Sequence, residues 1–197
     1  MWEGPPLDES FFGREADVVA RELVGTLLLH DTGVRRLAVR LVETEAYLDG
    51  RDLASHARFG QTRRNAAMFG PPGRAYVYFV YGMHTMLNVV TGPPGRPQAV
   101  LLRAAEPVMG DLAPMNGPAL LTRALGVQLS HNGVDLMRGP LRVVRGTPAP
   151  RIECGPRIGV GYAGAWSSAP LRFVDADSLV LSRKLPGRAR GDGIGAA

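Results

Sequence analysis

The sequence predicts an α+β fold: a single domain with a curved antiparallel β-sheet, flanking helices and a protruding β-hairpin. Strand-like segments follow one another through short Gly, Asp and Pro turns instead of alternating with long helices. A chain of 197 residues suits one domain, and no repeat or linker divides it. We therefore expect one domain over residues 1–186 and a disordered Gly, Ala and Arg tail over residues 187–197.

The first part of the chain predicts a helix followed by a long hairpin. Apolar residues at helical spacing predict a short amphipathic helix over residues 16–24, which Gly25 ends. Residues 26–30 and 36–47 then predict two strands joined by a turn at residues 31–33. The polar segment from residue 50 to residue 73 is too long for a simple connection, so we expect it to be a functional loop.

Further strands fill the second part of the chain. Residues 75–81 are dense in aromatic and β-branched side chains, and residues 82–91 continue them as a second arm after a bend. A third apolar strand is expected over residues 98–104. After it come a helix over residues 118–125, a strand over residues 134–144 broken at Gly139-Pro140, and a last strand over residues 171–174.

The composition is basic, with a formal net charge of +5 and a pI of about 10.0. Of the 23 basic residues only Lys184 is a lysine. Arginine suits a nucleic-acid surface because its planar fork matches phosphate. A GC-rich genome gives the same bias, so the charge alone identifies no partner. The single Cys154 excludes an internal disulfide, and no apolar leader or span is present, which predicts an intracellular protein without membrane contact.

The stretch VETEAY places two carboxylates and a phenol on a face that begins as hydrophobic core. By strand alternation Glu43, Glu45 and Tyr47 follow Leu41 on one face. Either the strand leaves the core before Glu43, or this is a functional site. Two carboxylates about 6.6 Å apart along one strand also fit an O-glycosidase that uses them as acid and base. That activity needs polar sugar-binding residues, and the sequence offers aromatic ones.

The stretch RAYVYFVYGM concentrates three tyrosines. Alternation places Tyr76 and Tyr78 on one face and Tyr81 on the other, and a bend near Gly82 would project Tyr81 outward. These rings are either ordinary core residues or a stacking pocket for a flat ring. In the second case Tyr81 would be a wedge that fills the gap left by a base turned out of a duplex.

Several longer motifs, in order from Phe11 to Phe173, resemble one known family. They are LVETEAYLDG, SHARFGQTRRNAAMFGPPGRAYVYFVYGMHTMLNVV, AVLLRAAEP, GPALLTRALGV and RIGVGYAGAW. Together they resemble the alkyladenine DNA glycosylases, the vertebrate-type 3-methyladenine DNA glycosylases that also occur in bacteria. The resemblance implies a base excision repair enzyme that flips alkylated, and in some cases deaminated, purines out of duplex DNA and hydrolyses the N-glycosidic bond. It also implies a bacterial cytoplasmic, nucleoid-associated protein.

The resemblance assigns roles to individual residues. Glu45 corresponds to the general base that activates the water, Arg103 to the arginine that helps hold this water, and Ile158 to a residue whose main-chain carbonyl contacts it. The side chains expected to enclose the flipped base are Tyr47, His56, Tyr78 and Asn88. Tyr81 corresponds to the intercalating tyrosine of the hairpin, and Met83 lies beside it.

The chain departs from the family pattern at three positions. Leu120 stands where a lysine is usual, which puts a phosphate contact there in doubt. His84 stands where an aromatic residue is common, and Tyr162 where a histidine can stand. The arginines expected to contact phosphates, or to serve only as solubilising charges, are Arg58, Arg63, Arg64 and Arg74.

One carboxylate is enough for this chemistry, because an alkylated purine is already a good leaving group. Glu43 is then expected to be structural, paired with an arginine or a backbone donor. No lysine stands near the strand motif, so we predict a monofunctional glycosylase without lyase activity. We expect no cofactor and no metal, with His30 and His131 facing solvent, and a monomer whose partner is double-stranded DNA.

Two alternatives remain open at this point. A non-catalytic protein that binds damaged DNA would keep the pocket without the chemistry, and a hydrolase of small nucleosides would have a closed pocket and no wedge.

Overall fold

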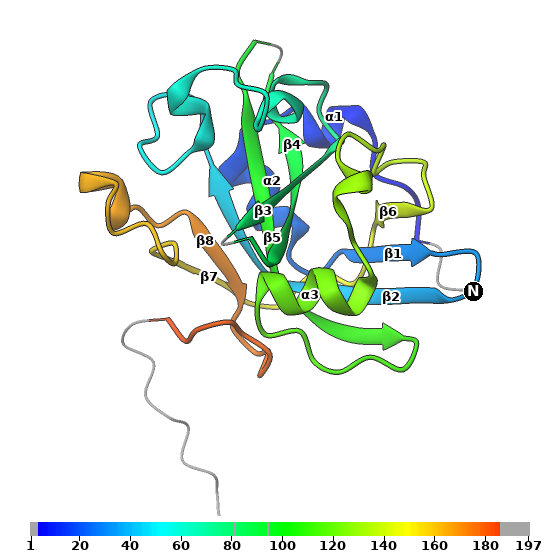
Figure 1. The fold of residues 1–197 in the computed structure, drawn as a ribbon. Helices are drawn as coiled ribbons and strands as arrows, with labels where there is room; N and C mark the ends of the chain where they lie inside the picture. The colour runs from blue at the N-terminus through cyan, green and yellow to red at the C-terminus, as the bar shows by residue number, and fades with distance from the viewer. Residues whose placement is uncertain (1–3, 81, 94, 186–197) are drawn as a thin grey trace, which may run out of the picture.

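The structure, a computed structural model, describes residues 4–80, 82–93 and 95–185. These residues form the predicted α+β fold around one curled antiparallel sheet (Figure 1). The strands are β1 Leu27–Asp31, β2 Arg36–Tyr47, β3 Ala75–Val80, β4 His84–Thr91, β5 Gln98–Met109, β6 Leu141–Val144, β7 Ile152–Gly155 and β8 Arg172–Asp175. The helices are α1 Glu9–Phe12, α2 Ala16–Leu23 and α3 Pro118–Leu125, with 3₁₀ helices η1 His56–Phe59, η2 Ala66–Phe69, η3 Leu129–His131 and η4 Gly164–Ser167.

The sheet forks along the long strand β2. In the order β3-β4-β5-β2-β1-β6, one edge of β2 pairs with β5 along its length. The other edge pairs with β1 over residues 36–40 and with β8 over residues 43–45. β7 continues the sheet beyond β8. The first half of β2 therefore belongs to a hairpin, and its second half lies in the middle of a different set of strands.

One face of the sheet packs against α2 and α3 to form the main core. Val19, Ala20 and Leu23 of α2 and Leu121 and Leu125 of α3 are fully buried against apolar residues of the strands. The segment after β2 covers part of the opposite face, where Ala57 of η1 and Met68 of η2 pack on the sheet. The predicted functional loop thus contains two short helices that lie on the face away from the main core.

The alternation of side chains along β2 between the two faces of the sheet is reversed at Glu43. Register shifts flank this residue, with one extra residue on β2 at Val42 and one on β5 at Arg103. Before the shift Leu41 faces the main core, and after it Ala46 does. The expectation that Glu43, Glu45 and Tyr47 share the face of Leu41 is therefore wrong, because the bulge reverses the alternation and turns them to the opposite side.

Most predicted elements are present with shifted ends. β5 runs on to Met109, whereas the strand expected over residues 134–144 is reduced to β6, because turns at residues 133–140 interrupt its pairing. α1 and β7 have no counterpart in the sequence prediction. β3 and β4 pair antiparallel, as residues 75–81 and 82–91 were expected to do after a bend, with Gly82 left-handed at φ 69°. Tyr81 and the tail over residues 187–197 lie outside the described residues.

Candidate active site

A row of residues across five strands brings the site together. Antiparallel partners run from Tyr76 on β3 to Asn88 on β4, Leu101 on β5, Glu45 on β2 and Arg172 on β8. Directly paired residues project to the same side of a sheet. The tyrosines and the carboxylate, which are far apart in the sequence, are therefore neighbours on one face.

Glu45 is fully buried and accepts three hydrogen bonds. Its Oε1 accepts from the main-chain N–H of Ile158 at 2.7 Å. Its Oε2 accepts from the hydroxyl of Tyr47 at 2.9 Å and from Nη1 of Arg103 at 3.2 Å. The family resemblance implies that the main-chain carbonyl of Ile158 contacts the water, and the structure shows that its N–H contacts Glu45. All three donors favour an ionised carboxylate.

The burial of Glu45 works against these donors. Removal from water raises the pKa of Glu45, while Arg103, the Ile158 N–H and the Tyr47 hydroxyl lower it, and the net direction is upward. Burial also raises the pKa of Tyr47 well above its usual value, so this phenol stays protonated and can donate to Glu45. The site holds a carboxylate with increased basicity, which is the property required of a general base.

Glu43 is fixed in an ionic network and is not free for acid–base chemistry. Its Oε1 accepts from Nε of Arg172 at 2.7 Å and from Nε of Arg103 at 3.2 Å. Its Oε2 accepts from the main-chain N–H of Ser182 at 2.6 Å. The expected pairing of Glu43 with an arginine or a backbone donor is confirmed, and both kinds of partner are present. These contacts argue against an O-glycosidase that uses Glu43 and Glu45 as acid and base.

An aromatic cavity lies beside Glu45. It is lined by Tyr47, Ala54, His56, Met68, Tyr76, Tyr78, Asn88 and Ala99, and its volume is about 20 Å³. This is room for about one water molecule. The ring centroids of His56 and Tyr78 are 4.8 Å apart, with 68° between the ring planes. The cavity is therefore too small for a flat ligand unless its rings move apart.

His56 is held at this cavity as a neutral ring. Its Nδ1 lies 2.8 Å from the hydroxyl of Tyr76. Burial lowers the pKa of His56, and the nearby Arg64 and Arg58 lower it further. Burial also raises the pKa of Tyr78 to about 12. At neutral pH the cavity is lined by uncharged rings with hydrogen-bonding groups, the combination that binds nucleobases in proteins.

A buried ion pair behind Tyr47 was missed by the sequence analysis. Nη1 and Nη2 of Arg157 bind the carboxylate of Asp52 at 2.5 and 2.8 Å, and Nη1 also binds the carbonyl oxygen of Ala46 at 2.8 Å. The guanidinium lies 4.7 Å from the centre of the Tyr47 ring. Arg157 precedes Ile158 in the RIGVG motif. Its place in this motif was the sequence signal that could have identified it as a site residue. The pair holds both Tyr47 and the Ile158 N–H in place.

The residues expected to contact DNA lie at the β3–β4 hairpin and beside the aromatic cavity, and one lies away from both. Met83, at the β3–β4 hairpin, is 70% exposed. Arg58 lies 4.3 Å from the ring of Phe59 and 5.2 Å from that of Tyr162, and these residues line a cavity of about 290 Å³ that also borders His56.

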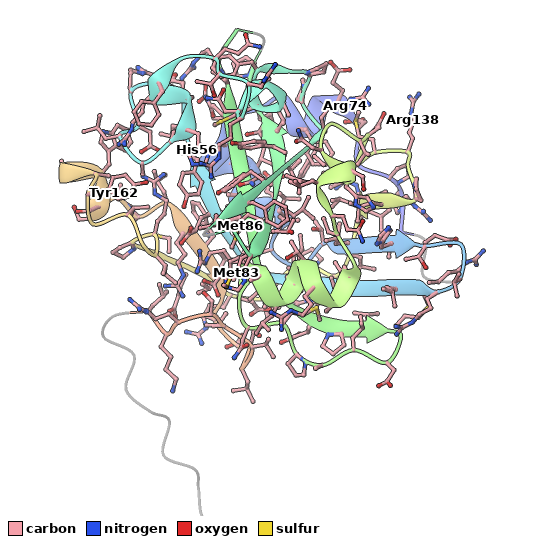
Figure 2. The ribbon with its side chains drawn as sticks, viewed as in Figure 1. His56, Arg74, Met83, Met86, Arg138 and Tyr162 are labelled. Carbon is pink, nitrogen blue, oxygen red and sulfur yellow. The ribbon has the colours of Figure 1, made fainter. Side chains whose placement is uncertain are left out.

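The expected arginines do not form one cluster. Arg64 also lines the cavity beside His56 and donates to the carbonyl oxygen of Phe79 at 2.8 Å, and Arg63 is exposed. Arg74 points away from His56 (Figure 2), 3.8 Å from Asp135. The structure thus brings Arg58 and Arg64 together with the pocket and leaves Arg74 apart from it.

Two histidines differ from expectation. His30 was expected to face solvent but is buried. The buried ring is satisfied by a hydrogen bond from its Nδ1–H to the carbonyl oxygen of Leu125 at 2.7 Å. His131 is half-buried, with its ring 5.1 Å from that of His30. Within residues 4–80, 82–93 and 95–185 no group of three His, Cys, Asp or Glu side chains could hold a metal ion.

The comparisons with known proteins agree with the geometry. The model of the family described as methylpurine-DNA glycosylase (MPG) matches residues 10–179. The chain belongs to this family. A relative from Anaeromyxobacter dehalogenans is 53% identical over 93% of this chain and 88% of its own length. Relatives from Myxococcus xanthus, at 49% over 91% and 95%, and from Methanocella arvoryzae, at 42% over 93% and 98%, are also similar.

Each of these three relatives is named as a candidate 3-methyladenine DNA glycosylase. Membership of the methylpurine-DNA glycosylase family makes the chain an enzyme of DNA repair, which decides against the non-catalytic alternative. Across the described ranges, no helix is long and apolar enough to cross a membrane.

Proposed function

We propose that this methylpurine-DNA glycosylase turns an alkylated purine such as 3-methyladenine out of duplex DNA and hydrolyses its N-glycosidic bond with a water activated by Glu45. The observation that supports this most is the position of Glu45. It is a buried carboxylate with three donors, hydrogen-bonded to the hydroxyl of Tyr47, and Tyr47 itself lines the aromatic cavity. A base held in that cavity would present its sugar next to the carboxylate.

Each residue of the site has a defined part in the reaction. The carboxylate of Glu45 accepts a proton from water while the water oxygen forms a bond to the anomeric carbon. The purine leaves with the electron pair of the broken C–N bond, which neutralises its positive charge. The negative charge of Glu45 also stabilises the cationic sugar that develops in the transition state. Arg103, whose Nη1 lies 3.2 Å from Oε2 of Glu45, favours the ionised form of this carboxylate.

The small volume of the cavity implies that a base binds only as the rings move apart. A purine needs far more space than about 20 Å³, so it can enter only when the His56 and Tyr78 rings move apart. Glu45 has no exposed surface, and the attacking water must reach it through the same opening. We propose that the flipped nucleotide separates the rings and exposes Glu45, so that the base becomes reactive only with a nucleotide in place.

The rings that would enclose the purine also explain a preference for damage. Tyr47 and Tyr78 are electron-rich and neutral, and a cationic alkylated purine gains cation–π attraction of about 1–2 kcal/mol when desolvated. Damaged bases also leave the DNA stack at lower cost. Hypoxanthine is neutral, so it gains no cation–π attraction and is a poorer leaving group when the N-glycosidic bond breaks. We therefore propose that deaminated purines are released more slowly than alkylated ones.

The proposed contacts with DNA place the hairpin in the minor groove. Met83, together with Tyr81, which lies outside the described residues, would fill the space of the flipped nucleotide. Arg58 and Arg64, beside the pocket, are the better placed candidates for phosphate contacts, followed by the exposed Arg63. Arg74 is the weakest of the four because it already lies near Asp135. The enzyme is proposed to act as a monomer without a cofactor.

The enzyme is further proposed to be monofunctional. Cleavage of the DNA strand by a lyase step requires an amine that attacks the sugar. The groups that contact Glu45 are a phenol, a guanidinium and a main-chain N–H, and none of them is a primary amine. Release of the base should therefore leave an intact strand that breaks only on treatment with alkali.

One assay tests this function. A duplex with a single alkylated adenine, or with hypoxanthine, is incubated with the wild type and with Glu45→Gln, and base release is measured under single-turnover conditions. We expect release by the wild type, and binding without release by the variant. Binding without release by both proteins over a panel of lesions would instead indicate a damage-binding protein, and cleavage without alkali would refute monofunctionality.

A further inference from the structure

A hydroxyl from outside the region matched by the family model reaches the network around Glu45. The family match ends at residue 179. Ser182 lies three positions further on, in the segment Ser182–Leu185, which we call the C-terminal strap. The Ser182 Oγ donates to Oε1 of Glu43 at 2.6 Å and accepts from Nε and Nη2 of Arg103 at 3.3 and 3.2 Å. One hydroxyl therefore contacts both the anion and the cation that lie next to Glu45.

The C-terminal strap is anchored along its length. Besides its hydroxyl, Ser182 donates its main-chain N–H to Oε2 of Glu43 at 2.6 Å. The carbonyl oxygen of Arg183 accepts a hydrogen bond from Nη2 of Arg172. Leu185 is 7% exposed, and a Cβ added at Gly155 on β7 would meet its side chain at 2.6 Å. Because hydrogen bonds and packing both fix the strap, the position of the Ser182 hydroxyl is well defined.

We propose that Ser182 is a positioning residue for the reaction, which holds the guanidinium of Arg103 between Glu43 and Glu45. The inference rests on the proposed role of Glu45. Arg103 divides its donors, with Nε directed to Glu43 and Ser182, Nη2 to Ser182, and Nη1 to Glu45. Without the hydroxyl, Nη2 has no partner among the described residues, and Oε1 of Glu43 loses a donor. Both changes draw the guanidinium toward Glu43 and away from Glu45.

The expected consequence is a change in the protonation of Glu45. The charged and titratable groups around this carboxylate are Arg103, Tyr47, Glu43, Arg157 and Tyr78, together with Arg172, its partner on β8. Arg103 is the nearest cation and the largest favourable influence on the ionised form. Its movement toward Glu43 would raise the pKa of Glu45 further, and excision would require a higher pH.

The test is the pH dependence of single-turnover excision, measured for the full chain on a duplex with one cationic purine such as 7-methylguanine. For Ser182→Ala we expect the midpoint of the acidic limb to move to higher pH. The rate one unit below the wild-type midpoint should then be roughly three- to tenfold lower, which corresponds to a shift of the midpoint by about 0.5–1 pH unit. The rate on the alkaline plateau should change by less than about twofold. Ser182→Thr keeps the hydroxyl and should restore the wild-type profile.

A matched control is present in the same part of the chain. Ser178 donates its hydroxyl to Oε1 of Glu106 at 2.6 Å, the same geometry as Ser182 with Glu43, but makes no contact with Arg103 or Glu45. Ser178→Ala should leave the midpoint unchanged. Glu43→Gln removes the anion that competes for Arg103 and should move the midpoint to lower pH, opposite to Ser182→Ala.

The outcomes separate this inference from the proposed function. An unchanged midpoint in Ser182→Ala, or a rate lowered equally at every pH, would show that Ser182 is only structural. Failure of Glu43→Gln to fold would leave the comparison of Ser182→Ala with Ser182→Thr decisive. If the wild type released no base, or Glu45→Gln were as active as the wild type, the proposed function itself would fail, whatever Ser182 did.

Discussion

The buried ion pair behind Tyr47 supports both the fold and the site, and the substitution Asp52→Asn tests it directly. Asparagine keeps the shape of the side chain and one acceptor oxygen but removes the charge. The side chains of Asp52 and Arg157 are both 0% exposed. Asp52 also accepts from the main-chain N–H groups of Leu48 and Ala54, so its position fixes the loop that follows β2.

The expected loss of stability follows from the burial of Arg157. An arginine cannot lose its charge in a folded protein, so the substitution leaves an uncompensated buried cation. Removing one partner of a buried pair costs about 3–5 kcal/mol of unfolding free energy. For a domain of this size that corresponds to a Tm lower by roughly 6–20 °C. The excision rate of the folded fraction should also fall, because Arg157 is followed by Ile158, whose N–H contacts Glu45.

Urea denaturation followed by tryptophan fluorescence and by circular dichroism measures the loss of stability. The matched control is Asp177→Asn, because Asp177 forms an equally short pair with Arg151, at 2.8 Å, whose side chains are 52% and 55% exposed. Exposed pairs contribute about 0–1 kcal/mol. If Asp52→Asn lost no more stability than Asp177→Asn, the buried pair would not be a support of this fold, and the explanation given for the position of Ile158 would be refuted.

Four further predictions follow from single residues. The rate of excision of a cationic purine by the wild type should rise with pH, because burial raises the pKa of Glu45. The midpoint of this rise should lie above the ordinary glutamate pKa of about 4.3. A midpoint at or below that value would contradict the role of Glu45 as the general base. Glu45→Gln should raise Tm at neutral pH, because a group with a raised pKa destabilises the fold once it ionises, and the difference should vanish at acidic pH where Glu45 is protonated. Met83→Ala should weaken binding of lesion duplex on the order of tenfold through lost apolar burial, whereas Leu179→Ala, at a residue 99% exposed, should bind normally in the same gel-shift titration. Thr91→Val should be neutral or stabilising by up to about 1 kcal/mol in urea, because the buried Oγ1 of Thr91 has no hydrogen-bond partner within the part of the chain that the structure describes.

The sequence was sufficient for the fold class because its strand and turn signals are local. The hairpins formed by β1 with β2 and by β3 with β4 depend on neighbouring residues and on glycines at the turns. The strand expected over residues 134–144 was wrong for most of its length. Its apolar residues Val134, Leu136 and Met137 are packed against the main core from a turn, and alternation does not distinguish that from a strand.

The site could be predicted only in part from the sequence. Alternation correctly placed Tyr76 and Tyr78 on one face, but it failed at Glu43, because a bulge depends on how two strands pair and leaves no signal in either alone. Glu43 and Tyr47 have partners that lie more than a hundred residues from them along the chain, namely Arg172, Ser182 and Arg157. Only the folded chain brings these groups together.

The small resting volume of the aromatic cavity has a consequence for the end of each catalytic cycle. In the proposed reaction, the rest of the bound DNA would hold a base that is still attached between the rings. Once detached, the purine would have only its own contacts to keep the rings of His56 and Tyr78 apart, and their return to a separation of 4.8 Å would expel it. Free purines should consequently be poor product inhibitors, with turnover limited by departure of the abasic strand.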